Sequence, residues 1–137
     1  GGLALAEMVS LCVAPYISSP HPSVRVQAAR TCLGLMVPPL GTLPRRSKLE
    51  EDVVTTLQQL LQASVSDPDP AVRGAIWAGI RPVHYPYISS RPATELLLMG
   101  LNDQSFEVRE KALIVSGQIS MLNPACVVPH LREHLTV

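Results

Sequence analysis

The 137-residue sequence has little charge and few aromatic side chains. Charged residues make up 16% of the chain, aromatic residues make up 4%, and the formal net charge is zero. Because nucleic-acid-binding domains usually carry an excess of basic residues, the balanced charge argues against that class. With so few aromatics, the core must be built mainly from aliphatic side chains, which favour close packing of helix on helix.

The chain also lacks the uninterrupted apolar run of about 18 residues that a transmembrane helix requires. Glu7 and Pro15 interrupt the longest candidate, GGLALAEMVSLCVAPYI, which has no basic start typical of a signal peptide. Cys12, Cys32 and Cys126 are odd in number, far apart and without C-x-x-C spacing. We therefore expect no membrane insertion, and free, buried thiols in a reducing, cytoplasmic compartment.

Motifs for catalysis and cofactor binding are missing as well. The glycines form neither G-x-G-x-x-G nor G-x-x-x-x-G-K-[ST], and no Ser/His/Asp or Cys/His set has a supporting context. We expect no cofactor and no catalytic residue in this segment. One formal match exists, HLREH from His130 to His134, which fits the zinc-protease pattern H-x-x-E-H. Without a visible third ligand, a mixed polar helix surface is the favoured interpretation.

What the sequence does contain is a repeat. Three stretches place polar turn residues before Val-Arg and a helical apolar pattern after it: SSPHPSVRVQAARTCLGL, SDPDPAVRGAIWAGI and NDQSFEVREKALIVSGQIS. Aligned on Val-Arg, the arginines are Arg25, Arg73 and Arg109, and the residues six positions earlier are Ser19, Asp67 and Asp103. The arginines are 48 and 36 residues apart, which is irregular but within the range of helical-pair repeats.

Apolar residues after each Val-Arg recur at helical steps of three and four. The rows are Val24, Ala28, Cys32 and Leu35; then Val72, Ile76 and Ile80; then Val108, Ala112, Val115, Ile119 and Leu122. Another helix precedes each of these. In SKLEEDVVTTLQQLLQAS, Ser47 and Glu50 have the spacing of a capping box before an apolar row. That row consists of Leu49, Val53, Leu57, Leu60 and Leu61.

These patterns predict an all-α fold, an α-solenoid of about three and a half antiparallel helix pairs, because stacked pairs bury faces that one pair cannot. The predicted helices are 3–14 and 22–37, 48–65 and 70–81, 92–102 and 105–121, with a fourth pair starting at 124. Residues 1–137 then form a single segment of a much larger chain, with repeats near 1–37, 48–81 and 92–121 and a partial one at 124–137. Residues 38–47 are the longest predicted loop, and HYPY at 84–87 is an ordered loop beside a helix end.

Aspartate and arginine recur in the turns, and two interpretations remain open for them. Each arginine can reach back to a carboxylate in its own turn, as the shared spacing of Asp67 to Arg73 and Asp103 to Arg109 allows, or forward to the turn of the next repeat. A functional ladder would bind phosphate or carboxylate, whereas a structural ladder would hold neighbouring repeats together. The balanced charges favour the structural one. Ser19 breaks the pattern, so Arg25 lacks an acid at that offset. Asp69 and Pro70 have the order of an N-cap and first helical residue.

The repeats resemble HEAT repeats, which have Asp in the turn and Val-Arg at the start of the second helix. SDPDPAVR, LNDQSFEVRE and LNPACVVPHLR, in this order and spacing, resemble more narrowly the N-terminal HEAT solenoid of the target of rapamycin (TOR) kinases, and VRVQAARTCLGLM resembles the repeat before them. The resemblance runs from about Leu11 to Arg132. The loop at 38–47 and the stretch IRPVHYPYISSRPA depart from it.

The resemblance implies a large serine/threonine kinase of the phosphatidylinositol-kinase-related family in nutrient and growth signalling, whose kinase domain lies outside this segment. It implies a scaffold that docks protein partners: a Raptor-type regulatory subunit, other TOR regions or a second TOR protomer, with no nucleic acid. It also implies a cytoplasmic protein recruited to lysosomal, vacuolar or other endomembranes through partners. The alternatives are an independent HEAT adaptor of the phosphatase-scaffold or transport-receptor type, and an enzyme with zinc at His130 and His134.

Overall fold

The computed structural model describes residues 16–40, 48–88 and 91–122. These residues form five α-helices and one 3-10 helix, with no strand among them: α2 (Pro22–Leu40), α3 (Lys48–Ser66), α4 (Pro70–Gly79), η1 (Pro82–Tyr87), α5 (Arg91–Gly100) and α6 (Phe106–Leu122). The all-α prediction is confirmed. The helices predicted at 3–14 and from 124 lie outside the described residues, as does the predicted cap Ser47. No described helix has both the length and the apolar character needed to cross a membrane.

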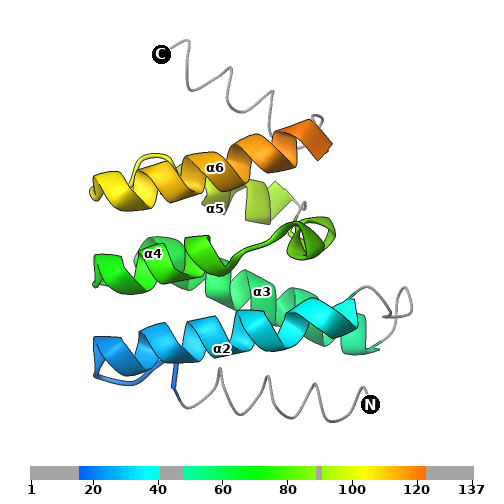
Figure 1. Cartoon of the computed structure of the whole chain (residues 1–137), viewed down its shortest axis with the longest axis horizontal. Helices are drawn as coiled ribbons and strands as arrows, with labels where there is room; N and C mark the ends of the chain where they lie inside the picture. Colours follow the sequence, from blue (N-terminus) through cyan, green and yellow to red (C-terminus); the bar gives the residue numbers. More distant parts are fainter. Residues whose placement is uncertain (1–15, 41–47, 89–90, 123–137) are drawn as a thin grey trace.

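The helices are arranged in two columns (Figure 1). In one column α2, α4 and α6 lie one above another, and α4 packs on both of its neighbours. In the other column α3 packs against α5, and the two columns meet where α3 contacts α4 and α5 contacts α6. The helices α2, α4 and α6 all begin at the same edge of the molecule, on the left in Figure 1. This repeated stacking confirms the predicted solenoid-like fold.

Helix α4 has 10 residues, whereas α2 has 19. Pro82 stops the helical hydrogen-bond pattern, so α4 ends at Gly79 with Ile80 extended, two residues before its predicted end. The predicted loop at 84–87 is instead part of η1, which continues beyond the end of α4 and contacts α2, α3 and α6. Helix α2 continues to Leu40, so the predicted loop at 38–47 was wrong for its first three residues.

Most of the predicted apolar rows are buried. The rows from Val72 and Val108 are buried throughout their described side chains, and Val53, Leu57, Leu60 and Leu61 form the core face of α3. Leu49 and Leu122 are outside the described side chains. The row predicted for α2 is only half right, because Val24 and Leu35 are partly exposed. Its buried residues include Ala29, Leu33 and Met36, on a face set by packing against α4.

A close approach fixes the position of α5. A Cβ atom on Gly100 would lie 2.5 Å from Cζ2 of Trp77 and 3.0 Å from Cβ of Ala112, so α4 and α6 leave no room for a side chain there. The Trp77 ring is itself held, since its indole nitrogen donates a hydrogen bond of 3.3 Å to the carbonyl of Ser64. Gly100 therefore allows α5 to pack directly on the indole ring of α4.

Candidate functional site: the arginine ladder

The turns before α2, α4 and α6 share one local structure. The side chain of the first turn residue accepts a hydrogen bond from the backbone N–H two residues later, which stabilises a tight turn. Ser19 Oγ accepts from His21 at 3.2 Å, Asp67 Oδ1 accepts from Asp69 at 2.9 Å, and Asp103 Oδ1 accepts from Ser105 at 2.8 Å. Ser19 therefore reproduces the turn of the two aspartates, although it carries no charge.

The helix starts follow directly from these turns. Asp69 caps α4, since its Oδ1 accepts from the N–H of Ala71 at 2.8 Å, and Pro70 opens the helix. This confirms the predicted cap. The carbonyls of His21, Asp69 and Ser105 accept from the N–H groups of Arg25, Arg73 and Arg109. Each arginine is thus placed one turn into its helix, with its side chain beside the turn.

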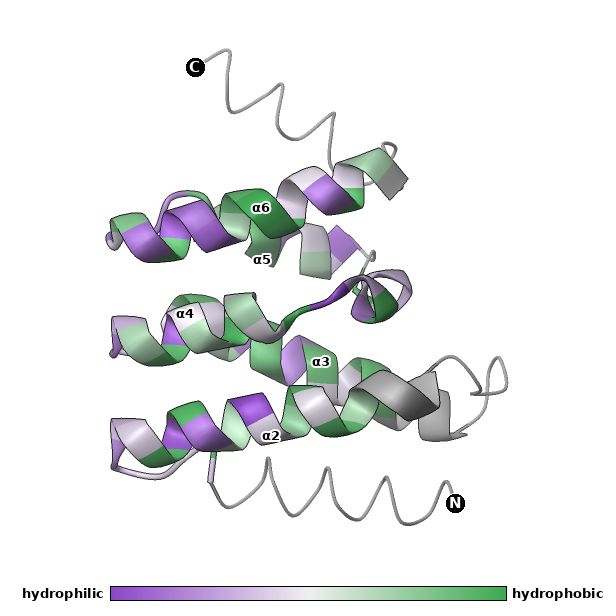
Figure 2. Cartoon of the chain, in the orientation of Figure 1, coloured by the Kyte–Doolittle hydropathy of each residue, from purple (hydrophilic) through white to green (hydrophobic). Residues whose placement is uncertain are grey.

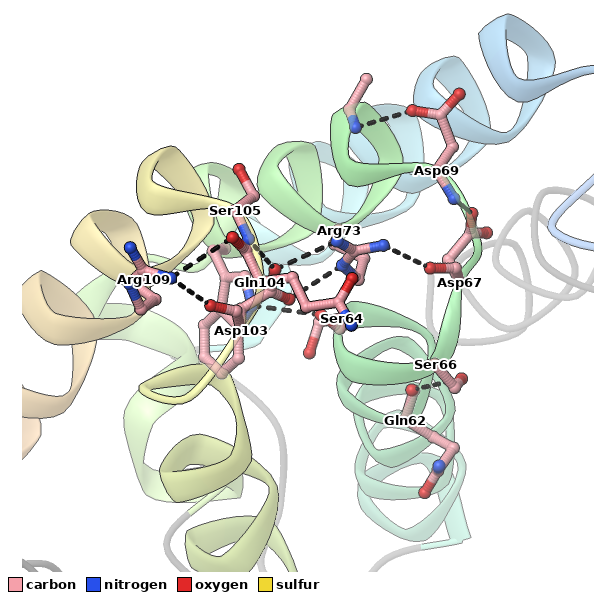
Figure 3. A network of polar contacts seen from close by, with 12 residues as sticks. Gln62, Ser64, Ser66, Asp67, Asp69, Arg73, Asp103, Gln104, Ser105 and Arg109 are labelled. Carbon is pink, nitrogen blue, oxygen red and sulfur yellow. Dashed lines mark hydrogen bonds and ion pairs between the residues drawn. The ribbon is translucent and has the colours of Figure 1, made fainter.

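Each arginine reaches back to its own turn through a backbone carbonyl (Figure 3 shows the second and third). Nη1 donates to the carbonyl oxygen six residues earlier: Arg25 to Ser19 at 2.8 Å, Arg73 to Asp67 at 2.8 Å, and Arg109 to Asp103 at 2.6 Å. The acceptor is a main-chain carbonyl and not the side-chain carboxylate that the spacing suggested, so the contact does not depend on an acidic side chain at that position. This is why Ser19 can replace aspartate in the first turn.

The carboxylates of Asp67 and Asp103 bind arginines of the preceding helix pair. Arg25 donates from Nε and Nη2 to the two oxygens of Asp67, at 2.9 and 3.2 Å, and Arg73 donates in the same way to Asp103, at 2.8 and 3.0 Å. The paired side chains are 11% and 7% exposed in the first pair and 12% and 6% in the second. We call the set Ser19, Arg25, Asp67, Arg73, Asp103 and Arg109 the ladder. The structure thus joins Arg25 to Asp67 and Arg73 to Asp103. Each pair connects two successive helix pairs, or units, and we call it a rung of the ladder.

The surroundings of Asp103, in the second pair, lower the pKa of its carboxyl group. Burial alone would raise the pKa of the Asp103 carboxyl. Hydrogen bonds from Arg73 and from the backbone of Ser105, together with the positive charges of Arg73 and Arg109, instead hold the pKa of Asp103 below its usual value. The carboxylate is therefore ionised at neutral pH and makes charge-assisted hydrogen bonds.

The ladder leaves little capacity for an external anion. Nε, Nη1 and Nη2 of Arg25 and of Arg73 all donate hydrogen bonds inside the protein. A phosphate or carboxylate ligand would have to displace an internal carboxylate that already makes two bonds. The geometry therefore favours a structural ladder over a ligand-binding one at these two arginines.

Arg109 differs from the other two arginines. Besides Asp103, its Nη1 donates to the carbonyl of Gln104 at 3.3 Å, and its guanidinium carbon lies 5.8 Å from the ring centroid of Phe106. Within the described ranges, 16–40, 48–88 and 91–122, no carboxylate is hydrogen-bonded or ion-paired to its guanidinium. The third rung of the ladder is therefore open on its outer side in this part of the chain.

The other candidate sites in the sequence are the histidine pair His130 and His134 and the HYPY stretch at 84–87. His130 and His134 lie outside the described residues, and no group of three or more metal-ligating side chains exists within them. In η1, His84 is fully buried and its Nδ1 accepts from the N–H of Arg81 at 2.9 Å; burial lowers its pKa. The buried Tyr85 donates its hydroxyl to Gln118 of α6. The HYPY stretch thus serves as packing between helices.

Together, the stacked helix pairs and the ladder define the chain as a helical solenoid-like segment. No known family profile matches it. It is 31% identical over 132 residues to the serine/threonine-protein kinase TOR2 of Saccharomyces cerevisiae, an alignment that includes 96% of this chain and 5% of that protein. It is 30% identical over 148 residues to the kinase TOR of Arabidopsis thaliana (98% and 6%), and 27% identical over 132 residues to tor1 of Schizosaccharomyces pombe (96% and 6%).

The chain is therefore related to a segment of the TOR serine/threonine kinases, as the motif resemblance indicated. It spans only 5 to 6% of the length of these relatives.

Proposed function

We propose that this chain is a HEAT-type solenoid segment of a TOR-type protein kinase and that it acts as a protein-interaction scaffold without catalytic residues of its own. The kinase activity would belong to another part of the same polypeptide. The similarity to TOR kinases over nearly the whole chain supports the family, and the short fraction of those proteins that it covers supports a non-catalytic segment.

The observation that carries the proposal is the ladder. Three successive units are joined by two arginine–carboxylate contacts of the same two-bond kind, and both arginines are also bonded to their own turns. Nearest-neighbour contacts of this kind give a solenoid its rigidity and its fixed spacing between units. A scaffold needs such rigidity, because binding surfaces on successive units must stay at constant distances from one another.

The partners that we propose are a Raptor-type regulatory subunit, other regions of the same kinase, or a second kinase protomer. Support comes only from the family resemblance and from the solenoid shape, which offers extended surfaces for proteins. Through such partners the protein would be held in the cytoplasm or at lysosomal, vacuolar or other endomembranes. An independent HEAT adaptor remains the second candidate, but the similarity to TOR kinases over 96 to 98% of the chain favours the first.

The test uses the whole parent kinase isolated from cells. The double substitution Arg25→Gln with Arg73→Gln breaks both described rungs, and Arg91→Gln, in an exposed pair, is the control. We expect the double variant to recover several-fold less Raptor-type subunit, while phosphorylation of a short peptide per kinase molecule is unchanged. The scaffold proposal is wrong if recovery of the subunit is unchanged although proteolysis shows a loosened segment, or if peptide phosphorylation is lost while recovery is normal.

A further inference from the structure

The 3-10 helix η1 lies outside the repeat pattern. It belongs to the stretch IRPVHYPYISSRPA, which departs from the motifs shared with the TOR kinases. In Figure 1 it lies beyond the end of α4, at the edge of the molecule opposite the ladder. Figure 2 shows a strongly hydrophilic stretch of ribbon just before η1 and mixed hydropathy within it. A surface formed by η1 is therefore particular to this chain and does not follow from the repeats.

The inner side of η1 is fixed to the helices around it. His84 and Tyr85 are buried, and η1 contacts α2, α3 and α6. The N–H of Arg81 donates to Nδ1 of His84 at 2.9 Å, and the N–H of His84 donates to the carbonyl of Arg81 at 2.9 Å. Tyr85 donates its hydroxyl to Gln118 of α6. Because η1 is held in this way, its outer side has one fixed arrangement, which reduces the entropy lost on binding.

The outer side of η1 combines one cation with apolar rings. Arg81, Pro82 and Pro86 are exposed, and Val83 and Tyr87 are partly exposed. We call these five residues the η1 patch. Neither proline has a backbone N–H, so a partner meets ring carbons and the guanidinium group there and finds no backbone donor at these two positions.

Arg81 carries the charge of the η1 patch. Residues 70–94 contain three arginines and no aspartate or glutamate. Arg73 bonds Asp103, and Arg91 lies beside Glu95. In the part of the chain that the structure describes, no acidic side chain forms an ion pair with Arg81. Its planar guanidinium group is therefore available for a two-bond contact with a carboxylate of another molecule.

We propose that the η1 patch docks an acidic segment of a protein partner, with an aspartate or glutamate on Arg81 and an apolar side chain against the rings of Pro82 and Pro86. This inference rests on the proposed function, since it names a surface through which the scaffold would bind. Arginine beside apolar side chains is typical of the centres of protein interfaces. An anionic membrane or a nucleic acid fits less well, because clusters of several basic residues bind these, and the η1 patch has one.

The test uses the whole parent kinase in cells, with the photoreactive residue p-benzoylphenylalanine in place of Pro86. After irradiation, mass spectrometry identifies the molecule and the position to which this residue is crosslinked. Pro82 serves as a second crosslinking position, because it is exposed on the same patch. We expect crosslinks to a protein segment that has Asp or Glu within a few residues of the crosslinked position.

Charge reversal then tests the role of Arg81. Arg81→Glu should lower the crosslinking yield several-fold, and replacing the partner's acidic residue with arginine should restore the yield in that variant. The proteolysis pattern of Arg81→Glu should match that of the unsubstituted kinase, because both bonds between Arg81 and His84 use backbone atoms of Arg81. Arg91→Gln is the matched control, since this exposed arginine lies outside the η1 patch and beside Glu95, and it should leave the yield unchanged.

Several outcomes would overturn the inference: crosslinks to lipid or nucleic acid, crosslinks to a segment without acidic residues, an unchanged yield in Arg81→Glu, or no crosslink from either position. The proposed function is tested separately. If the η1 patch fails but the double variant Arg25→Gln with Arg73→Gln still loses the regulatory subunit, the scaffold stands without this surface. If the patch crosslinks as expected but the double variant keeps the subunit, the docking surface stands and the role of the ladder in the scaffold fails.

Discussion

The ladder makes a quantitative prediction for Arg73, which bonds Asp103 through two nitrogen atoms and the Asp67 carbonyl through the third. Removing one partner of a fully buried ion pair costs about 3–5 kcal/mol, whereas an exposed pair contributes about 0–1 kcal/mol. The Arg73 and Asp103 side chains are 12% and 6% exposed, so the pair lies near the buried limit. We therefore expect Arg73→Gln to lower the free energy of unfolding by about 3 kcal/mol.

Urea unfolding measures this loss, followed by the fluorescence of Trp77, which is buried and is the single tryptophan of the chain. A double-mutant cycle that adds Asp103→Asn separates the pair from its surroundings, because asparagine keeps an oxygen for the N–H of Ser105. We expect a coupling free energy of about 2 kcal/mol between the two substitutions. Arg73→Lys should lose most of that coupling, because an ammonium group cannot make both parallel bonds to the carboxylate.

Arg91→Gln is the control for an exposed pair. Nε of Arg91 lies 3.7 Å from Oε1 of Glu95, one turn further along α5, and the two side chains are 80% and 60% exposed. Its substitution should change the free energy of unfolding by no more than about 0.5 kcal/mol. If Arg73→Gln costs no more than Arg91→Gln, or if the coupling in the cycle is below about 0.5 kcal/mol, then burial does not strengthen the ladder and the reasoning is refuted.

Three further predictions use other parts of the structure. Burial lowers the pKa of His84 below the 6.5 of an unperturbed histidine, so the folded state binds fewer protons than the unfolded state. This contribution to stability is complete above pH 6.5 and is lost as the pH falls through the lowered pKa. His84→Gln should therefore weaken the fall in the free energy of unfolding that urea titrations measure below pH 6.5, and an unchanged pH dependence would contradict the burial argument. Gly100→Ala should lower the free energy of unfolding by about 1–3 kcal/mol through its clash with Trp77, whereas Gly117→Ala, with open space around it, should raise it by about 0.5–1 kcal/mol; equal effects in calorimetry would contradict the close approach. Asp69→Ala should cost about 1 kcal/mol by removing the cap of α4, and no loss on urea unfolding would mean that the cap does not stabilise the helix.

Helix positions and turns could be predicted from the sequence because their signals are local. Asp69 and Pro70 mark the start of α4 through their own backbone preferences, and Pro82 marks its end in the same way. The apolar rows from Val72 and Val108 identify the buried faces because helical spacing alone places them on one side. These features depend on residues only a few positions apart.

The partner of each arginine could not be fixed from spacing. The offset of six leads to a backbone carbonyl, which any residue supplies, and Ser19 therefore serves as well as Asp67. The carboxylate comes from the next turn, at separations of 42 and 30 residues, and no fixed-spacing pattern contains both. The available signal was the recurrence of aspartate in successive turns, which allowed the forward contact without distinguishing it from the backward one.

Packing against neighbours determined the remaining differences. The buried face of α2 is set by α4, so Val24 and Leu35 are partly exposed while Ala29 and Leu33 are buried. Likewise, η1 fills the place that the short α4 leaves between α2 and α6, which burial of His84 and Tyr85 reflects. A pattern within one helix carries no information about which neighbour will cover it.

The contacts of the ladder are the same although the repeats differ in length. The structure therefore shows how this solenoid-like fold accommodates repeats with different numbers of residues. The two rungs close with nearly the same distances although one spans 42 residues and the other 30. Each ladder arginine lies near a helix start, and each aspartate follows a helix end, so added length extends away from this edge. The 19-residue α2 and α3 extend further towards the right of Figure 1 than the 10-residue α4 and α5. Insertions at that far edge can therefore lengthen the helices without disturbing the contacts that join one unit to the next.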